Sequence, residues 1–229
     1  GSPRNDGNGT YSGHVRVHSW DGSSWSQLGS DIDGEAVRDS SGFSVSLDSD
    51  GDRVAIGALR TDGTGANAGH VRIYSYNGSS WSQLGSDIDG EAAGDLSGYS
   101  VSLDSDGDRV AIGAHENDGT GSNAGHVRVY SWSGTSWTQL GADIDGEAAS
   151  DAFGVSVALN SSGDRLIVGA DANDGAGSGA GHARVFSWNG SAWSQLGSDI
   201  DGEASGDRSG FSVDIDSDGD RAAIGAYDN

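Results

Sequence analysis

Carboxylates recur at a fixed spacing along this chain of 229 residues. The octet GSDIDGEA, written GADIDGEA in the third copy, begins at Gly29, Gly85, Gly141 and Gly197, at intervals of 56 residues. Ca²⁺ is bound by about six to eight oxygen ligands, which acidic, glycine-rich loops can supply. One interpretation is therefore a set of Ca²⁺ sites with these candidate ligands: Asp31, Asp33, Glu35, Asp39, Asp87, Asp89, Glu91, Asp95, Asp143, Asp145, Glu147, Asp151, Asp199, Asp201, Glu203 and Asp207.

The other interpretation of the octets is structural. Asp-Gly sequences build turns, because the carboxylate accepts hydrogen bonds from nearby backbone amides. No copy carries the full ligand spacing of a calcium loop. Copies that arise by duplication also inherit their loop chemistry whether or not they bind an ion. This interpretation predicts solvated connecting loops, and we favour it over the cation sites.

A second acidic set lies in the segment LDSDGD. Its members are Asp48, Asp50, Asp52, Asp104, Asp106, Asp108, Asp216, Asp218 and Asp220. The third copy instead has Asn160, Ser162 and Asp164. An Asp-Gly between two alternating apolar runs is a strong signal for a tight β-hairpin turn. We expect a turn here, because a site that needed all these oxygens would not tolerate the third copy.

Four histidines, His14, His70, His126 and His182, also repeat, each two residues before an arginine. Zinc ligation was considered, but a third strand of each repeat would hold them far from one another. The predicted role is structural, with the arginines paired to neighbouring Asp or Glu. No nucleophile elbow, HExxH motif or cysteine nucleophile is present, which argues against an enzyme.

The elements that position these residues are predicted to be short strands. Each period contains four runs in which apolar and polar residues alternate, such as FSVSL, RVAIGA, HVRIYSY and WSQLG, separated by Gly, Asp, Asn and Ser. A four-stranded meander is too small to be stable alone and must be covered by its neighbours. The predicted fold is all-β: a β-propeller built from four 56-residue, four-stranded blades.

Aromatic residues flank the outer turn of every repeat. The pairs are Trp20 and Trp25, Tyr76 and Trp81, Trp132 and Trp137, and Trp188 and Trp193. They suit cross-strand packing. Stacking on sugar rings is the alternative use of such residues.

Composition restricts the partners and the compartment. A net charge of −23 disfavours nucleic acid and anionic membranes, and no apolar run is long enough for membrane insertion. The chain has no cysteine and a strongly acidic surface, which fits an extracellular or cell-surface location.

The repeat boundaries do not coincide with whole blades. We interpret residues 1–5 as a remnant of an expression vector and residues 6–229 as four propeller repeats. The chain starts before a third strand and stops after a second strand. The terminal blade would be completed by strands from both chain ends, giving a four-bladed monomer, or by a second chain. We favour the second chain, in which two half-rings form an eight-bladed ring; a fragment of a longer array is a third reading.

The third repeat resembles an FG-GAP repeat, the unit of the integrin α-subunit propeller and of related bacterial surface proteins and fungal lectins. The matching residues are Phe153-Gly154, the strand SVAL, the VGA after the hairpin and the strand GAGHARVF. Similar elements recur in every copy, although Ser replaces the Phe elsewhere, as at Ser41. LDSDGD also resembles the calcium loop of integrin-type repeats but is about one residue shorter. The resemblance implies an extracellular propeller.

Together these observations predict a non-enzymatic extracellular module for binding, adhesion or scaffolding; cations on its acidic loops are the less favoured of the two interpretations of those loops. One alternative is a purely structural or engineered self-assembling repeat without a ligand, and another is a carbohydrate-binding lectin. The expected partners are a second copy of the chain and a protein or glycan ligand.

Overall fold

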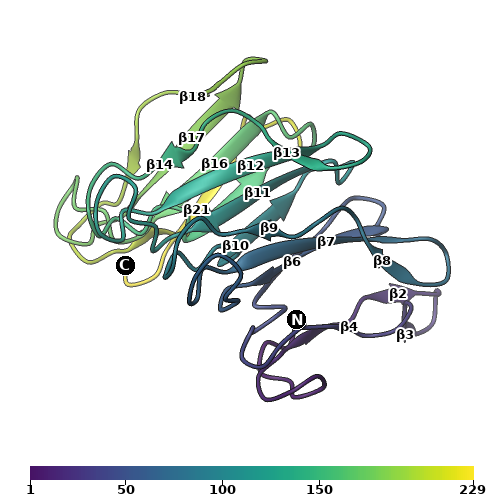
Figure 1. Ribbon diagram of the computed structural model, residues 1–229. Helices are drawn as coiled ribbons and strands as arrows, with labels where there is room; N and C mark the ends of the chain where they lie inside the picture. Colours follow the sequence, from purple (N-terminus) through teal and green to yellow (C-terminus); the bar gives the residue numbers. More distant parts are fainter.

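The computed structural model describes residues 1–229 and consists of strands and turns without a helix. Three complete blades follow one another along the chain (Figure 1). The first contains β5 (Ser44–Leu47), β6 (Arg53–Ala58), β7 (His70–Tyr76), β8 (Trp81–Gln83) and β9 (Ile88–Asp89). The second contains β10 (Ser100–Leu103), β11 (Arg109–Ala114), β12 (His126–Trp132), β13 (Trp137–Gln139) and β14 (Ile144–Asp145). The third contains β15 (Ser156–Leu159), β16 (Arg165–Ala170), β17 (His182–Trp188), β18 (Trp193–Gln195) and β19 (Ile200–Asp201).

Partial blades lie at the two ends of this stack. The N-terminal one has β1 (His14–Val15), β2 (His18–Trp20), β3 (Trp25–Gln27) and β4 (Ile32–Asp33). The C-terminal one has β20 (Ser209–Ile215) and β21 (Ala222–Ala226). No hydrogen-bonded pairing joins the two, and the chain ends lie on opposite sides of the stack (Figure 1). The repeated four-stranded units match the predicted all-β repeat architecture, whereas closure of the terminal blade within one chain is not present.

The hairpin between the first two strands of each blade is a tight turn, as expected from LDSDGD. The Asp48 carboxylate accepts a hydrogen bond from the Arg53 amide, 3.0 Å away. In the third copy the Asn160 side chain accepts the equivalent bond from Arg165 at 2.9 Å. An amide oxygen thus replaces a carboxylate without changing the turn, which explains why this copy tolerates Asn.

The middle of the acidic octet is a strand, so the prediction of a connecting loop throughout was wrong there. Ile88 and Asp89 pair with Val71 and His70 of β7 beyond the end of β8. The reason is burial: Ile88 is only 5% exposed and belongs to a core cluster, so the chain returns to the sheet to bury it. The fourth strand of each blade is therefore interrupted at its Gln-Leu-Gly and resumes at the Ile-Asp of the octet.

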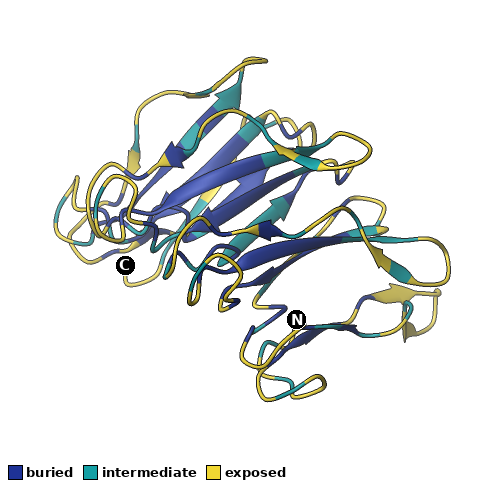
Figure 2. Ribbon diagram, viewed as in Figure 1, coloured by how far each residue is buried: buried dark blue, intermediate teal, exposed yellow.

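The apolar core lies between blades (Figure 2). One cluster joins Val15, Val17 and Ile32 of the N-terminal partial blade to Val54 and Ile56 of β6. Close approach is possible because glycines of successive blades face each other. At Gly113 an added Cβ would lie 2.1 Å from the Gly154 carbonyl oxygen of the next blade. Each sheet is thus buried by its neighbours, as the repeat pattern predicts.

Polar bonds with a constant sequence offset also link successive blades. The indole N–H of Trp81, Trp137 and Trp193 donates to the carbonyl oxygen of Leu28, Leu84 and Leu140 respectively, at 2.7, 2.8 and 2.9 Å. The aromatic pairs predicted across each outer hairpin are confirmed; the Tyr76 and Trp81 ring centroids, for example, are 5.1 Å apart. Packing and hydrogen bonding between blades therefore account for these residues.

Residues 1–5 follow the path of the end of a second strand. Ser2 forms a bridge with His14, as Ala58 does with His70 in the next blade. An added Cβ on Gly1 would meet the Gly42 carbonyl, as one on Gly57 would meet Gly98. Residues 1–5 and 225–229 are therefore equivalent positions, separated by 224 residues or four periods of 56.

Candidate functional site

Each third strand places a histidine at the boundary between two blades. His70, His126 and His182 are the first residues of β7, β12 and β17 and are 4%, 1% and 1% exposed. They pair in register with Asp89, Asp145 and Asp201 on the returning strand segments β9, β14 and β19. The backbone of the octet is thereby held directly beside the imidazole.

Two carboxylates converge on each of these imidazoles, one from the same blade and one from the blade before it. The second blade's group is His126, Asp143 and Glu91: Nδ1 lies 4.0 Å from Asp143 Oδ2 and 3.8 Å from Glu91 Oε2. Equivalent groups are Glu35, His70 and Asp87, and Glu147, His182 and Asp199. In all three, the potential ligand atoms lie within 4.8 Å of one another. We call these the inter-blade triads.

Neighbouring side chains hold the carboxylates of the triads in place. Gln139 Nε2 donates to Asp143 Oδ1 at 2.7 Å, which leaves Oδ2 facing the imidazole. Arg128 Nη1 lies 3.6 Å from Glu91 Oε1, and its Nη2 donates to the Asp89 carbonyl at 2.7 Å. The predicted pairing of these arginines with acidic residues is therefore confirmed, and each carboxylate keeps one oxygen directed at the histidine.

The imidazoles themselves have no hydrogen-bond partner. Nε2 of His70, His126 and His182 is buried without one, and Nδ1 is beyond hydrogen-bond distance of the carboxylates. Burial, assisted by the charge of Arg128, lowers the pKa of His126 to about 4. The pKa values of His70 and His182 are lowered as well, mainly by burial. These histidines are therefore neutral at pH 7 and present a lone pair.

A neutral imidazole and two carboxylates form a donor set that can hold a metal ion. Imidazole nitrogen suits Zn²⁺, Cu²⁺ and Ni²⁺, whereas Ca²⁺ prefers oxygen ligands alone. Three protein ligands also leave one tetrahedral position to water. Asp143 is 33% and Glu91 45% exposed at the side chain, so the triad is open to solvent on one side.

Of the sixteen carboxylates predicted as Ca²⁺ ligands, only Asp31 and Asp33 converge within their own octet, beside His14. In the first octet Asp31 faces His14, and the equivalent Asp of later octets joins a triad. Glu35 reaches His70 of the next blade instead. Asp39 is buried and caps its own loop by accepting from the Ala36 amide at 2.7 Å; Asp95, Asp151 and Asp207 do the same.

Sequence reasoning missed the histidine as the centre of the group. The Glu of one octet and the next His are 35 residues apart, and that His precedes its own Asp by 17. Only the stacking of blades brings these three positions together. The constant offset between a buried strand-start His and acidic residues in two successive repeats is the signal that could have found it.

The acidic hairpins form a separate feature. Burial raises the pKa of Asp104 to about 6, with a contribution from the adjacent charge of Asp108. Its Oδ1 accepts hydrogen bonds from the Asp108 and Arg109 amides, both at 3.0 Å. The role of this hairpin carboxylate is therefore to accept hydrogen bonds from the backbone of its own turn.

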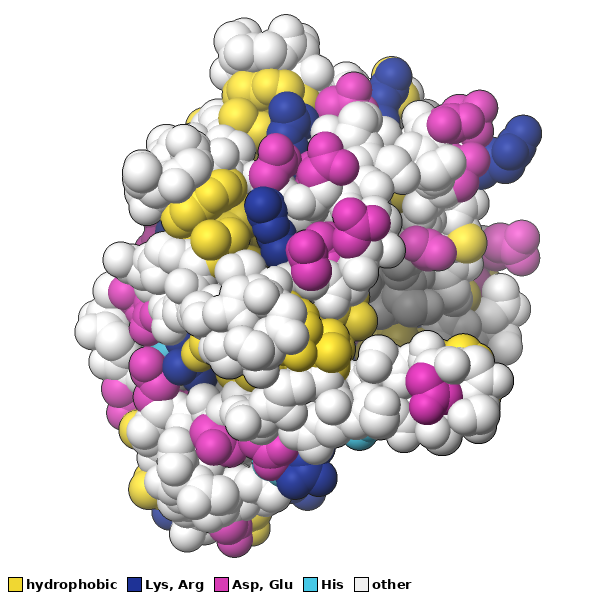
Figure 3. All heavy atoms as spheres, turned by 90° about the vertical axis from the view of Figure 1, so that its right-hand side faces the viewer, with side chains coloured by type: hydrophobic (Ala, Val, Ile, Leu, Met, Phe, Trp, Pro, Cys, Tyr) yellow, Lys and Arg dark blue, Asp and Glu magenta, His cyan; other side chains and the backbone are white.

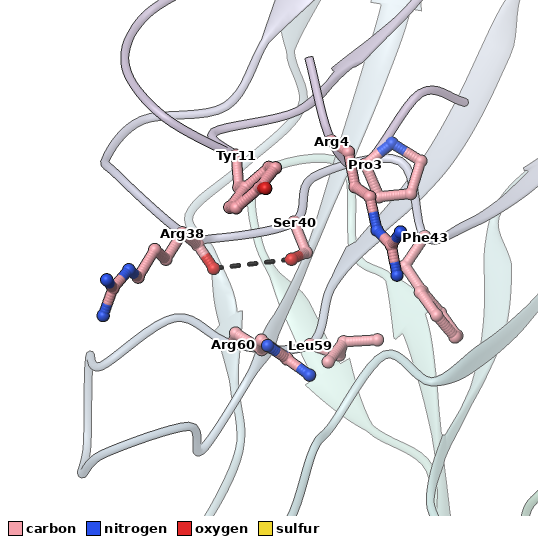
Figure 4. Close-up of a pocket in the computed structure, with 8 residues that line it drawn as sticks. All are labelled: Pro3, Arg4, Tyr11, Arg38, Ser40, Phe43, Leu59 and Arg60. Atoms are coloured by element: carbon pink, nitrogen blue, oxygen red, sulfur yellow. Dashed lines mark hydrogen bonds between the residues drawn. The ribbon is translucent and has the colours of Figure 1, made fainter. Parts of the chain in front are cut away.

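A cavity of about 660 Å³ lies at the N-terminal end of the stack (Figure 4). It is lined by Pro3, Arg4, Tyr11, Arg38, Ser40, Phe43, Leu59 and Arg60. The side chains of Arg4 and Phe43 lie together on one side, Leu59 and Arg60 lie on another, and Arg38 points away. The Arg38 position is not arginine in the other repeats, and the Arg60 position is arginine again only at Arg4, so this cavity breaks the symmetry of the blades.

Acidic side chains also lie on the surface away from this cavity. Figure 3 shows them spread over the face it presents, with a few arginines among them. This follows from 35 acidic against 12 basic residues. No helix of the chain has the length and apolar character to span a membrane.

No family model matches the chain, and no curated protein matches it. A solved structure described as a 6-phosphogluconolactonase from Bacteroides uniformis matches with a TM-score of 0.57 and 9% identity, over 82% of this chain and 49% of that one. Hydrazine synthase from Kuenenia stuttgartiensis matches with a TM-score of 0.49 and 12% identity, covering 80% and 41%. A further 6-phosphogluconolactonase-like structure, from Bacteroides fragilis, has a TM-score of 0.48 and 12% identity, covering 69% and 38%.

The chain thus spans between 38% and 49% of the length of these three solved structures. At 9% identity the similarity to the Bacteroides uniformis structure concerns the fold alone, which is propeller-like. The class defined by fold and comparison is therefore an all-β, propeller-like repeat protein.

Proposed function

We propose that this chain is a non-enzymatic, extracellular propeller module of FG-GAP type, for binding or scaffolding, in which divalent cations link adjacent blades at the inter-blade triads. The observation that supports it most is the unpaired, nearly fully buried imidazole of His126, which faces carboxylates from two different blades. A cation bound there would be held by both blades and would stabilise their stacking. It would also offset the repulsion between the acidic loops.

The donor set favours a transition-metal ion such as Zn²⁺ over the Ca²⁺ expected from the octets. The arginine of each triad opposes the cation, because Arg128 shares Glu91 with the site. It contacts Oε1 while Oε2 faces His126, so one oxygen is free to bind the metal. Gln139 plays the corresponding part for Asp143 and acts as an orienting neighbour of a metal ligand.

Calorimetric titration of the EDTA-treated protein at pH 7 tests this proposal. We expect Zn²⁺ to bind with heat and to raise the melting temperature, and Ca²⁺ to do so weakly or not at all. His126→Gln should lower the stoichiometry by one site. His18→Gln is the matched control, because His18 on the exposed strand β2 belongs to no triad, and it should leave the stoichiometry unchanged. Absence of heat and of thermal stabilisation with both ions would refute the cation sites.

The arginine-lined cavity favours a ligand-binding role at the N-terminal end. Arg60 borders it in a chain of net charge −23, so the ligand that suits it is a carboxylate-bearing or sulfated glycan or an acidic protein segment. A glycan array with native protein and with Arg60→Ala tests this role. Selective binding of acidic glycans that Arg60→Ala loses would support it. No binding to any glycan would leave the scaffold function, the lectin alternative being excluded.

A further inference from the structure

Contacts that every internal blade makes are absent at the two ends of the stack. The unpaired groups at one end are the equivalents of the partners that are absent at the other end. Trp25 is equivalent to Trp81 but is 68% exposed, with no acceptor for its indole N–H. Leu196 is equivalent to Leu28, whose carbonyl receives the Trp81 N–H, but it is 47% exposed. An added Cβ on Gly29 would touch Trp81, whereas around Gly197 there is nothing within 4 Å.

The arginines show the same complementarity. Arg72, Arg128 and Arg184 donate to the carbonyl oxygens of Asp33, Asp89 and Asp145 in the preceding blade. Arg16 has no preceding blade and folds back on Asp31. The carbonyl of Asp201, at the other end, is the equivalent acceptor for Arg16.

Apolar surface follows this pattern too. A cavity of about 650 Å³ at the C-terminal end is bordered by Leu196, Ile200, Ile215 and Ile224. In internal blades the matching region is filled by residues such as Trp81, which packs on the cluster of Val54, Ile56 and Ile32. Trp25 is the residue equivalent to Trp81 in the N-terminal partial blade.

Backbone edges are complementary in register. Within a complete blade Ala55 pairs with Ile73, and Gly57 with Val71. The residues equivalent to Ala55 and Gly57 in the C-terminal partial blade are Ala223 and Gly225, and those equivalent to Ile73 and Val71 in the N-terminal one are Val17 and Val15. The same pairing would therefore place Ala223 opposite Val17 and Gly225 opposite Val15. β21 and β2 lack a partner on this side, and β1 is paired there only by the bridge of Ser2 to His14. Two unpaired strand edges of matching sequence favour association with each other.

We propose that the N-terminal partial blade of one chain completes the C-terminal partial blade of a second copy, and that two copies close into one ring. Association is head to tail, so each pair of copies buries two identical split blades. The two edges of a single chain lie on opposite sides of the stack (Figure 1), which favours a second copy over closure within one chain.

Residues 1–5 compete with the proposed partner for one short edge. Ser2 is bridged to His14, the position that Ala226 of a second copy would take. Gly1 lies against Gly42, where Gly225 of the second copy would lie. Association therefore requires displacement of residues 1–5 by the equivalent residues 225–229. In the closed ring Glu203 would also meet His14 and Asp31. Binding of a cation by these three residues is the one consequence of the ring that rests on the proposed function.

Disulfide cross-linking tests the register directly, because the chain has no cysteine. In Val17→Cys/Ala223→Cys the two thiols would face each other across the completed blade, at the Cα separation of paired strands that a disulfide accepts. We expect a cross-linked species of twice 23.2 kDa on non-reducing gels under mild oxidation in EDTA. His18→Cys/Ala223→Cys is the control: it is one residue out of register and points to the other face, and His18 is exposed.

Light scattering of the native chain completes the test. A mass of twice 23.2 kDa at micromolar concentration supports the ring of two copies. Deletion of residues 1–5 should make this dimer more stable. Gly225→Ala should lower the dimer fraction at least tenfold, because its Cβ would meet the partner's backbone, while Thr135→Ala on an exposed turn should not. A 23.2 kDa species at all concentrations, an intramolecular disulfide, or an open series of larger oligomers would each overturn the proposal.

Discussion

At the scale of single residues, the same side chain has different surroundings in different repeats, which provides internal controls. Trp137 donates to Leu84 at 2.8 Å between blades, whereas Trp25 donates to nothing and is 68% exposed. The sequence around both is nearly the same. Differences between equivalent variants therefore measure the contact rather than the substitution.

Trp137→Phe is expected to lower the free energy of unfolding by about 2 kcal/mol, since it leaves a partly buried carbonyl without its donor and removes packed area. Trp25→Phe should change it by less than about 0.5 kcal/mol under conditions in which the chain is monomeric. Urea denaturation of both variants measures these values. Equal effects of the two substitutions would show that the bond between blades contributes nothing.

His115 provides a pH-dependent contribution outside the triads. Burial lowers its pKa to about 4, and its ring lies 4.0 Å from that of Tyr99. Because the unfolded state, with a histidine pKa near 6.5, binds the proton more readily, stability present above pH 6.5 is lost as pH falls towards 4. The expected loss is on the order of 3 kcal/mol.

His115→Leu, which copies Leu59 at the equivalent position, should remove this loss. Asp104 acts in the opposite direction, because its raised pKa of about 6 favours the folded state as pH falls. The variant must therefore be compared with wild type at each pH. Denaturation in EDTA from pH 7 to pH 4 gives the two profiles. Parallel profiles would contradict a buried, neutral His115.

At the scale of elements, the close packing of successive blades depends on glycines in the second strands. An added Cβ on Gly113 would lie 2.1 Å from the Gly154 carbonyl oxygen. The equivalent Cβ on Gly225 would meet mainly the Ser212 hydroxyl, which can rotate away. Glycine is thus required at Gly113, between two blades, but not at Gly225, at the end of the stack.

Gly113→Ala is expected to destabilise the chain by about 3 kcal/mol or more, because two backbones must separate. Gly225→Ala should cost less than about 1 kcal/mol in the monomer. Thermal or urea unfolding compares the pair. Tolerance of Gly113→Ala would mean that the blades can slide apart at little cost.

Strands, hairpin turns and aromatic pairs could be predicted from the sequence because each depends on residues within one repeat. The alternation in HVRIYSY and the Asp-Gly of LDSDGD are local signals. The strand at Ile88 was missed, although the pattern Asp-Ile-Asp alternates, because the flanking carboxylates suggested a loop. The triads were missed because they join Glu91 to His126, and that distance is set by how one sheet packs on the next.

At the scale of the whole molecule, charge opposes compactness. The chain carries −23, and the carboxylates of successive octets lie near one another at the blade boundaries. The arginine pairs that bridge the blades involve half-exposed Glu residues and are each worth about 1 kcal/mol or less. Net repulsion should therefore exceed attraction between ion pairs.

Raising NaCl from about 10 mM to 300 mM should increase the melting temperature by several degrees, because salt screens the repulsion among like charges. Calorimetry at pH 7 in EDTA measures the change, and potassium acetate in place of NaCl separates screening from chloride binding. A decrease with salt would indicate that the bridging pairs dominate.

The repeated bonds that join two blades connect residues at a constant separation, 53 for the indole bonds and 54 for the Ser44-type hydroxyl bonds to glycine carbonyls. A gene rearrangement that adds or removes one whole period would recreate each bond at the new junction. Such a change in length requires no newly evolved surface, so the number of units in this kind of protein can vary by recombination alone while each unit remains folded.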